Sequence, residues 1–147
     1  EGVIFVRPND GDKPFKAGLF DIQDFYREYE QLSDYKNDLV IISSPKNILG
    51  EFRFLVTADK EIIAVSSYRY QGLLTKVPSA PLEATEFCRK VLDVGYFPDS
   101  VFCIDVAQSD DGSCWLMELT SASSAGLYAM DKKKVVQGIA NYLTKHD

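Results

Sequence analysis

Two apolar segments are the most informative part of this chain: Phe102-Cys103-Ile104-Asp105-Val106-Ala107 and Trp115-Leu116-Met117-Glu118-Leu119-Thr120. Both have the composition of β-strands, and the residues that join them include the pair Asp111-Gly112. An Asp-Gly pair is preferred in two-residue hairpin turns, because both central residues of such a turn need positive φ. With this pair at the centre of the turn, counting outward along both strands places Asp105 directly across from Glu118.

The same register sorts the side chains of the hairpin onto two faces. The face expected to meet the core carries Phe102, Ile104, Val106, Met117, Leu119 and Trp115. The other face carries Cys103, Asp105, Ala107, Leu116, Glu118 and Thr120. Across such a pair the Cβ atoms of Asp105 and Glu118 would lie about 4.5–5.5 Å apart, where two like charges are unfavourable.

Two facing carboxylates favour a hard divalent cation between them, usually Mg²⁺ completed by phosphate oxygens. Without a cation, replacing Asp105 or Glu118 by alanine should stabilise the fold slightly, because the change relieves the repulsion. Acidic residues on a hairpin are more often only solvated, so the pair alone leaves both interpretations open.

The composition is that of a globular domain with a sizeable core. The chain has 147 residues, and its nine Phe, eight Tyr and one Trp argue against disorder. Its formal net charge of −6 argues against a broad surface for nucleic acid or for an anionic membrane. No stretch approaches the length of a membrane-spanning helix, and no signal peptide opens the chain.

The cysteines and the single histidine exclude several kinds of site. Cys88, Cys103 and Cys114 lack metal-ligand spacing and are interpreted as reduced thiols of a cytoplasmic protein. His146 is expected to lie in a solvated tail, which excludes His-dependent catalytic triads and HExxH metal sites. The chain begins at Glu1 on the edge of an apolar run, so we expect an excised or processed fragment.

Strands and helices interleave along the rest of the chain. Apolar runs predict buried strands over 2–7 and 39–42, and a hairpin over 51–57 and 62–70. In that hairpin Phe52, Phe54 and Val56 share one face, and the partner of Arg53 is left open between Ser66 and Ser67.

Three helices are expected, over 21–33, 81–94 and 131–145. Asp21 and Asp131 are the predicted N-caps of the first and last helix, and Gly95 is predicted to stop the middle one. The last helix is expected to face the core with Val135, Val136, Ile139, Ala140 and Leu143. The predicted class is α+β, a largely antiparallel sheet with flanking helices in one domain over 1–147.

Several polar residues stand where a strand ends or faces a pocket. They are Arg7 and Lys13 near the first strand, Glu51 and Arg53 on one strand face, Arg69 at the end of the hairpin, and the pair Asp105 and Glu118. A single Arg at a strand end is more often a surface ion pair. Together these residues indicate one chemistry, in which cations hold a polyphosphate and acids hold its metal.

The order of these motifs resembles the C-terminal half of ATP-grasp proteins, the carboxylate–amine ligases related to the enzyme that adds glutamates to a ribosomal protein. The similarity is to the phage and bacterial branch, in which a strand ending in Arg-Pro is followed by Asp-x-Lys. The matching stretches are Phe5-Val6-Arg7-Pro8-Asn9-Asp10-Gly11-Asp12-Lys13-Pro14-Phe15, Glu51-Phe52-Arg53-Phe54, Ser67-Tyr68-Arg69, Ile104-Asp105-Val106, Met117-Glu118-Leu119-Thr120 and Gly126-Leu127-Tyr128. They follow the family order over nearly the whole chain.

The resemblance implies an ATP- and Mg²⁺-dependent ligase that activates a carboxylate as an acylphosphate and then joins it to an amine. Asp105, Glu118 and Thr120 would be the Mg²⁺ ligands, and Arg53 and Arg69 the catalytic residues facing the γ-phosphate and the acylphosphate. The cofactor-binding residues would be Arg7, Lys13, Ser43, Ser44, Lys46 and Glu51. The expected substrates are small-molecule or peptide carboxylates and amines.

Two features depart from the family pattern. Thr120 stands where the family usually has Asn, and a hydroxyl is a weaker ligand than an amide carbonyl. The N-terminal lobe that usually helps to bind substrate has no counterpart here, so we expect a missing lobe or a partner chain.

Two other interpretations compete with a ligase. A degenerate ATP-grasp fold could serve as a non-catalytic nucleotide-binding module, and Thr120 favours that alternative. A Mg²⁺-dependent nuclease also sets an Asp before Glu-x-Lys on a hairpin, but it would require Lys or Gln at position 120. Nucleotide separates the three, because a ligase turns over ATP with a carboxylate, a module only binds it, and a nuclease ignores it.

Overall fold

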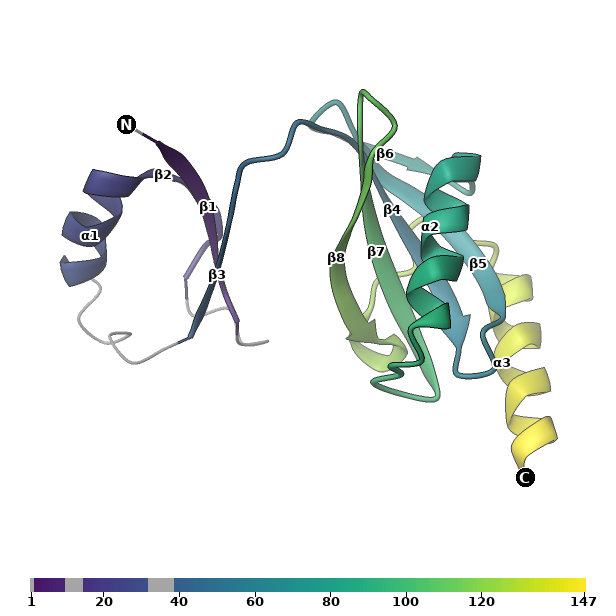
Figure 1. The fold of residues 1–147 in the computed structure, drawn as a ribbon. Coiled ribbons are helices and arrows are strands. Elements are labelled where there is room, and N and C mark those ends of the chain that lie inside the picture. The colour runs from purple at the N-terminus through teal and green to yellow at the C-terminus, as the bar shows by residue number, and fades with distance from the viewer. Residues whose placement is uncertain (1, 10–14, 32–38) are drawn as a thin grey trace. The chain divides into compact units, whose positions relative to one another are not determined.

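The structure, a computed structural model, describes residues 2–9, 15–31 and 39–147. The chain divides into two units, Glu1–Lys46 and Asn47–Asp147 (Figure 1). Each unit contains one sheet, and every strand pairing among the described residues is antiparallel. The predicted α+β class is therefore confirmed. In the part of the chain that the structure describes, no helix has both the length and the apolar character needed to cross a bilayer.

Unit 1, Glu1–Lys46, is a three-stranded sheet with one helix. β1 (Val3–Pro8) lies between β2 (Gly18–Asp21) and β3 (Val40–Ser43), and α1 (Ile22–Gln31) follows β2 directly. Asp21 is the predicted N-cap, and its carboxylate accepts a hydrogen bond from the backbone N–H of Gln23 at 2.9 Å. The short β2 was not predicted, and the predicted helix end at Ser33 lies outside the described residues.

The two predicted strands of unit 1 are less buried than their apolar composition suggests. Val6 and Pro8 are buried, but Val3 is 51% exposed, Ile42 is 54% exposed, and Leu39 just before β3 is 74% exposed. β3 pairs with a neighbour on one side only, so its side chains have fewer packing partners than those of a central strand. The strands are confirmed, whereas their full burial was wrong.

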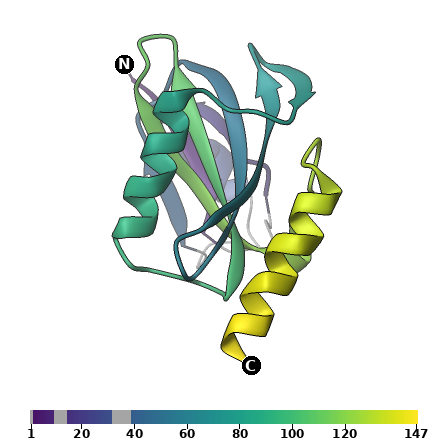
Figure 2. The same cartoon turned by 90° about the vertical axis from the view of Figure 1, so that its right-hand side faces the viewer.

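Unit 2, Asn47–Asp147, is a five-stranded sheet with a helix on each face. The order across the sheet is β6-β5-β4-β7-β8. The strands are β4 (Ile48–Thr57), β5 (Ile62–Tyr70), β6 (Leu73–Val77), β7 (Val101–Ser109) and β8 (Cys114–Ser121). α2 (Leu82–Asp93) packs on one face and α3 (Lys132–His146) on the other, as Figure 2 shows.

Alternation along β4 divides the core of unit 2 into two layers, as its sequence predicts. Phe52, Phe54 and Val56 enter the layer under α2, and Leu55 enters the layer under α3. The first layer also contains Ala84, Cys88, Leu92, Phe102, Ile104 and Val106, and the second Ala64, Cys103, Met130 and Val135. The first layer is the larger one, because α2 covers the aromatic side of the sheet.

Both helices of unit 2 begin and end near the predicted residues. The carboxylate of Asp131 caps α3 by accepting hydrogen bonds from the N–H groups of Lys133 at 2.9 Å and Lys134 at 3.2 Å. α2 is followed by Gly95, whose φ of +82° suits a C-terminal stop.

α3 contacts the sheet with a narrower stripe than predicted. Val135 is buried and Ile139 packs against the same layer, but Val136 is 66% exposed and Leu143 is 52% exposed. Ala140 is also exposed, so three of the five predicted core positions were wrong. A single helix beside a sheet touches it only along one line of side chains, and these three lie off that line.

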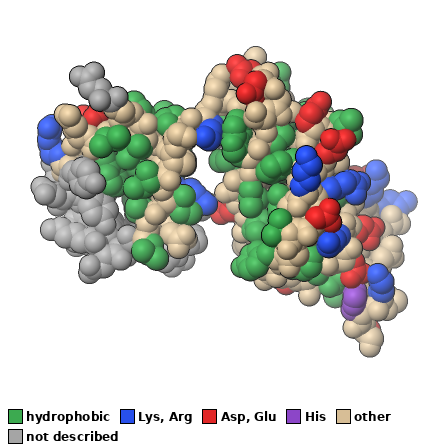
Figure 3. Space-filling view, viewed as in Figure 1, with side chains coloured by type: hydrophobic (Ala, Val, Ile, Leu, Met, Phe, Trp, Pro, Cys, Tyr) green, Lys and Arg blue, Asp and Glu red, His purple; other side chains and the backbone are tan. Residues whose placement is uncertain are grey.

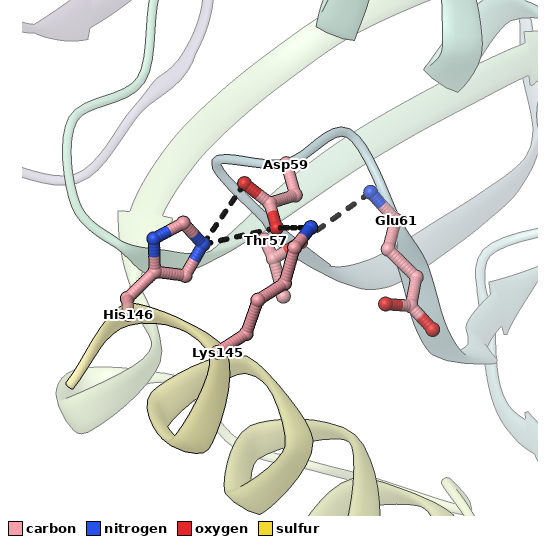
Figure 4. A network of polar contacts seen from close by, with 5 residues as sticks. All are labelled: Thr57, Asp59, Glu61, Lys145 and His146. Carbon is pink, nitrogen blue, oxygen red and sulfur yellow. Dashed lines mark hydrogen bonds and ion pairs between the residues drawn. The ribbon is translucent and has the colours of Figure 1, made fainter.

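The C-terminal end of α3 is attached to the β4–β5 turn. The carboxylate of Asp59 accepts a hydrogen bond from Lys145 Nζ and lies 3.0 and 3.1 Å from His146 Nε2 (Figure 4). These contacts hold the pKa of Asp59 below its usual value, chiefly through the Lys145 hydrogen bond. The prediction that His146 belongs to a solvated tail was therefore wrong, because the helix continues through it and its ring pairs with Asp59.

The β7–β8 hairpin pairs Asp105 with Glu118, as predicted, although its turn is not the predicted one. Ser109 N–H donates to the Ser113 carbonyl at 2.9 Å, which leaves three residues in the loop, and only Gly112 among them has positive φ. Met117 has no partner across the pair and forms a β-bulge. The longer loop and the bulge shift the register in opposite directions, so the two effects cancel beyond Met117.

Between the turn and the bulge, the predicted faces were wrong. Leu116, not Met117, lies across from Val106, and Trp115 lies across from Ala107. Trp115 is therefore placed on the face of Asp105 rather than on the α2 face, where Cys114 packs instead.

A second hairpin joins β5 to β6 through Gln71-Gly72 and was not predicted. Tyr70 pairs with Leu73, and the two central residues have φ of +48° and +76°, the combination that a two-residue turn requires. In the preceding hairpin the partner of Arg53 is Ser66, which resolves the alternative left open by the sequence. Tyr68 has no partner in β4 and forms a bulge.

Candidate active site

A row of polar residues crosses one face of the unit 2 sheet. Ser66 on β5 lies across from Arg53 on β4, Arg53 lies across from Asp105 on β7, and Asp105 lies across from Glu118 on β8. Adjacent rows place Arg69 across from Glu51, and Thr120 across from Cys103. Six predicted site residues thus share one sheet face: Glu51, Arg53, Arg69, Asp105, Glu118 and Thr120.

Arg53 and Asp105 form a buried, bidentate ion pair. Arg53 Nε donates to Asp105 Oδ1 at 2.8 Å, and Nη2 donates to Oδ2 at 2.7 Å. Arg53 is only 8% exposed and Asp105 only 3%. The hydrogen bonds to Asp105 raise the pKa of Arg53 above its ordinary value, so the guanidinium is charged throughout.

This ion pair changes the meaning of the two facing carboxylates. The negative charge of Asp105 is balanced by a strand that the hairpin alone does not reveal. Removing Asp105 would leave a buried guanidinium without its counter-charge, which is costly. The expectation that Asp105→Ala would stabilise the fold by relieving repulsion was therefore wrong in its premise.

Two tyrosines and a carbonyl hold the other side of the Arg53 guanidinium. The rings of Tyr68 and Tyr128 stack with centroids 4.9 Å apart, and Arg53 Cζ lies 5.8 and 5.1 Å from their respective centroids. Arg53 Nη1 donates to the carbonyl of Gly126 at 3.2 Å. Tyr128 has φ of +49°, a left-handed conformation that costs free energy in a residue with a side chain and here turns its ring toward Arg53.

Sequence reasoning quoted these tyrosines but gave them no role. Tyr68 stands beside Arg69 and Tyr128 follows Gly126 within the matched motifs, and this proximity was the available signal. Ser66 was also missed as a support, since its hydroxyl accepts a hydrogen bond from the N–H of Ala129 at 3.1 Å. That bond fixes the start of the segment that carries α3.

Glu51 and Arg69 lie at the open side of the row. Arg69 Nε is 3.7 Å from Glu51 Oε1, and the Arg69 side chain is 54% exposed. Burial, followed by the charges of Asp105 and Glu51, raises the pKa of Tyr68. Arg69 is thus the solvent-accessible cation of this face, whereas Arg53 is the enclosed one.

The oxygens of Asp105, Glu118 and Thr120 are of the class that Mg²⁺ prefers. Thr120 Oγ1 is buried and has no hydrogen-bond partner among the described residues, which suits an atom awaiting a ligand. The described residues contain no group of three His, Cys, Asp or Glu side chains arranged to hold a metal. A carboxylate accepts up to about four hydrogen bonds, so the two from Arg53 do not exclude a cation at Asp105. These donors fit a Mg²⁺ ion that takes its other ligands from a nucleotide.

The remaining predicted residues belong to unit 1. Arg7 is half-buried in β1 across from Ile41, and Ser43 is the exposed last residue of β3. Lys46 Nζ donates to Ser44 Oγ at 2.6 Å just after β3. Lys13 lies outside the described residues.

Solved structures with a similar fold include complexes of the ATP-grasp ligase PsnB. The complex with precursor peptide PsnA2 and AMPPNP has a TM-score of 0.57 and 15% identity, over 87% of this chain and 39% of that chain. The complex with a minimal precursor, Mg and ADP has a TM-score of 0.55 and 14% identity, over 86% of this chain and 40% of that chain. This chain therefore spans about two fifths of PsnB, and the likeness concerns the fold.

Sequence comparison identifies the family directly. No curated protein matches the chain. A family model described as an ATP-grasp domain, the second family of its clade, matches residues 1–138. The match extends over both units and every predicted site residue, and it confirms the resemblance drawn from the motifs. This chain belongs to that family of ATP-grasp domains.

Proposed function

We propose that the chain, over 1–147, is a catalytic domain of an ATP- and Mg²⁺-dependent carboxylate–amine ligase. The observation that carries the proposal is the Arg53–Asp105–Glu118 row beside Arg69, in a chain of ATP-grasp family. A substrate carboxylate oxygen attacks the γ-phosphorus of ATP and releases ADP, which forms an acylphosphate. An amine then attacks the acyl carbon, forms the amide and expels inorganic phosphate, with loss of a proton from nitrogen.

In this reaction Arg53 and Arg69 balance charge on the transferred phosphoryl group. Arg53 has five N–H donors, of which three bond to Asp105 and Gly126, so two others are left for phosphoryl oxygens. Its plane is fixed by the tyrosine stack, and a preorganised donor needs little rearrangement during the reaction. Arg69 is exposed enough to meet a substrate that arrives from solvent.

Asp105 and Glu118 would hold Mg²⁺, and Thr120 would add its hydroxyl. When bound, the cation neutralises phosphate charge and orients the polyphosphate. We assign nucleotide binding to Arg7, Lys13, Ser43, Ser44, Lys46 and Glu51, from their match to the family motifs. A reducing cytoplasmic compartment would suit Cys88, Cys103 and Cys114, which are all free thiols.

A peptide is the carboxylate or amine substrate we favour. The support comes from PsnB, whose solved complexes contain a precursor peptide or a minimal precursor. A missing lobe or a partner chain would then help to bind that peptide, because the chain covers only part of PsnB.

Hydroxylamine trapping tests the ligase proposal. The purified protein that contains this chain, incubated with Mg²⁺–ATP, hydroxylamine and a panel of amino acids and peptides, should yield ADP and a hydroxamate of the correct donor. Arg69→Lys should lower kcat about tenfold or more with a smaller change in ATP affinity, because a point charge cannot imitate a bidentate guanidinium. Arg89→Lys on α2, the opposite face, is the matched control and should leave both quantities unchanged. Nucleotide binding without ADP or hydroxamate for any donor would contradict the proposal.

A non-catalytic nucleotide-binding module is the second candidate. It is favoured by Thr120 at the usual Asn position and by Asp105, whose two oxygens are already bonded to Arg53. Thr120→Asn separates the two, because it restores an amide carbonyl at that position. For a ligase the variant should bind Mg²⁺–ATP more tightly by calorimetry or turn over faster, with Ser121→Asn as the control. If Thr120→Asn weakens both binding and turnover, Thr120 has another purpose.

A further inference from the structure

A cavity of about 370 Å³ lies between β5 and the start of α3. Its walls are the four consecutive β5 residues 62–65, together with Pro78, Asp131 and Lys134. Figure 2 shows α3 running beside β5, and the two elements are in contact. None of the lining residues belongs to the Arg53 row, so the cavity is separate from the candidate active site.

The β5 segment that lines this cavity is an open sheet edge. β6 pairs with β5 only between Ser67 and Tyr70, and Pro78, just after β6, has no N–H with which to extend the ladder. Among the described residues no strand pairs with 62–66 on that side. Ser67 N–H donates to Ser79 O at 3.2 Å on the β6 side, and strand alternation directs the N–H and carbonyl of Val65 the same way. An unpaired edge of this kind is a template for strand addition.

The charge on the cavity wall comes from Lys134. The carboxylate of Asp131 is engaged as the N-cap of α3, whereas Lys134 forms no ion pair with any described residue. Lys132 and Lys133 precede it, and three cations in the first turn oppose the helix dipole. Over the α2 side of unit 2, by contrast, acidic and basic side chains are interspersed (Figure 3). The start of α3 is therefore complementary to an anion.

We propose that this cavity binds an extended peptide segment with an acidic side chain, which adds to β5 as a strand in line with β6. Residues 62–65 span roughly 10 Å at about 3.3 Å per residue, so the cavity accepts about three residues of such a strand. Backbone hydrogen bonds to Val65 hold the segment, Ile63 and Pro78 contact its apolar side chains, and Lys134 pairs with its carboxylate. The proposal does not depend on ligase activity.

The test uses fluorescein-labelled, end-blocked hexapeptides of alternating valine and glutamate, with a valine–lysine series as the charge control. The glutamate peptide should bind by fluorescence anisotropy and the lysine peptide should not. Lys134→Glu should weaken binding tenfold or more, whereas Lys133→Glu, the same charge change one residue away and outside the cavity, should weaken it less than twofold. Amide hydrogen exchange at Val65 should slow in the complex.

Backbone pairing is tested by N-methylation of alternate residues of the glutamate peptide. One of the two alternate patterns should abolish binding and the other should not, because only one set of N–H groups faces β5. Equal losses in Lys134→Glu and Lys133→Glu, unchanged exchange at Val65, or no binding of any glutamate peptide at millimolar concentration would overturn the proposal. A dimer in light scattering with Val65 protected in the absence of peptide would also overturn it, in favour of a second copy of the chain.

Discussion

At the scale of single residues, Arg53 organises the candidate site. It is bonded to Asp105 and Gly126 and stacked beneath two tyrosines, so one side chain joins three parts of unit 2 that are far apart in sequence. From the sequence alone a surface ion pair was the commoner outcome for an arginine at such a position. The structure places it in the interior instead, where its charge requires Asp105.

Asp105→Ala should therefore destabilise the protein by about 3–5 kcal/mol, because it leaves Arg53 buried without its counter-charge. Urea unfolding at pH 7 without nucleotide measures the effect. Arg53→Met combined with Asp105→Ala should recover most of the loss, since it removes both charges together. Glu118→Ala, on the same face but half-exposed, is the control and should cost at most about 1 kcal/mol. Similar losses for Asp105→Ala and Glu118→Ala would refute the importance of the pair.

At the scale of elements, turns and close contacts determine how strands and helices meet. The chain contains two X-Gly pairs in hairpins, and the two-residue turn forms at Gln71-Gly72 rather than at Asp111-Gly112. α3 approaches β5 closely at Gly138, where an added Cβ would lie 2.5 Å from Ile63 Cγ2 and 2.9 Å from Cγ1. A glycine inside a helix is unfavourable by propensity, so its presence here reflects this contact.

Gly138→Ala should destabilise the protein by about 1 kcal/mol, because overpacking against Ile63 outweighs the gain in helix propensity. Gln137→Ala, one residue earlier and exposed, has no such contact and should be neutral or slightly stabilising. Thermal and urea unfolding of both variants provide the comparison. Ile63→Ala added to Gly138→Ala should cost less than it does in the wild type, since it makes room for the new methyl group. A net gain from Gly138→Ala would mean that Ile63 moves aside freely.

At the scale of the whole molecule, each core layer of unit 2 encloses one thiol. Cys88 lies in the α2 layer and Cys103 in the α3 layer, and both are almost fully buried. Burial raises the pKa of Cys88 to about 12 and that of Cys103 to about 11. In the unfolded chain both thiols ionise near their ordinary pKa, so alkaline pH favours unfolding.

The free energy of unfolding should therefore be intact below about pH 8.5 and fall as pH rises toward 11. For Cys103 alone the loss reaches about 2 kcal/mol at pH 11, since its pKa moves from 9.0 to about 11 and each unit is worth about 1.4 kcal/mol. Urea unfolding at pH 8, 9 and 10 measures the slope. Cys103→Ala should have a shallower slope than the wild type, and the double variant with Cys88→Ala a shallower one still. Identical slopes in all three proteins would assign the alkaline loss to other groups.

Local sequence signals were enough to predict the class of fold, the place of most strands and helices, and the pairing of Asp105 with Glu118. These signals are alternation, N-caps such as Asp131, and stops such as Gly95. The pairing was correct because the extra loop residue and the Met117 bulge offset each other, which no local rule predicts. The motif order also identified the family, which the match over residues 1–138 confirms.

Which charges meet, and how deeply they lie, depends on the tertiary packing. β4 and β7 are about fifty residues apart in sequence, and their adjacency, which brings Arg53 to Asp105, follows from the packing of the whole sheet. The positions of Tyr68 and Tyr128 depend on a bulge and on a left-handed backbone, and both conformations are held by their surroundings. A residue's type and spacing can thus nominate it for a site, but its partner and its burial are properties of the folded sheet.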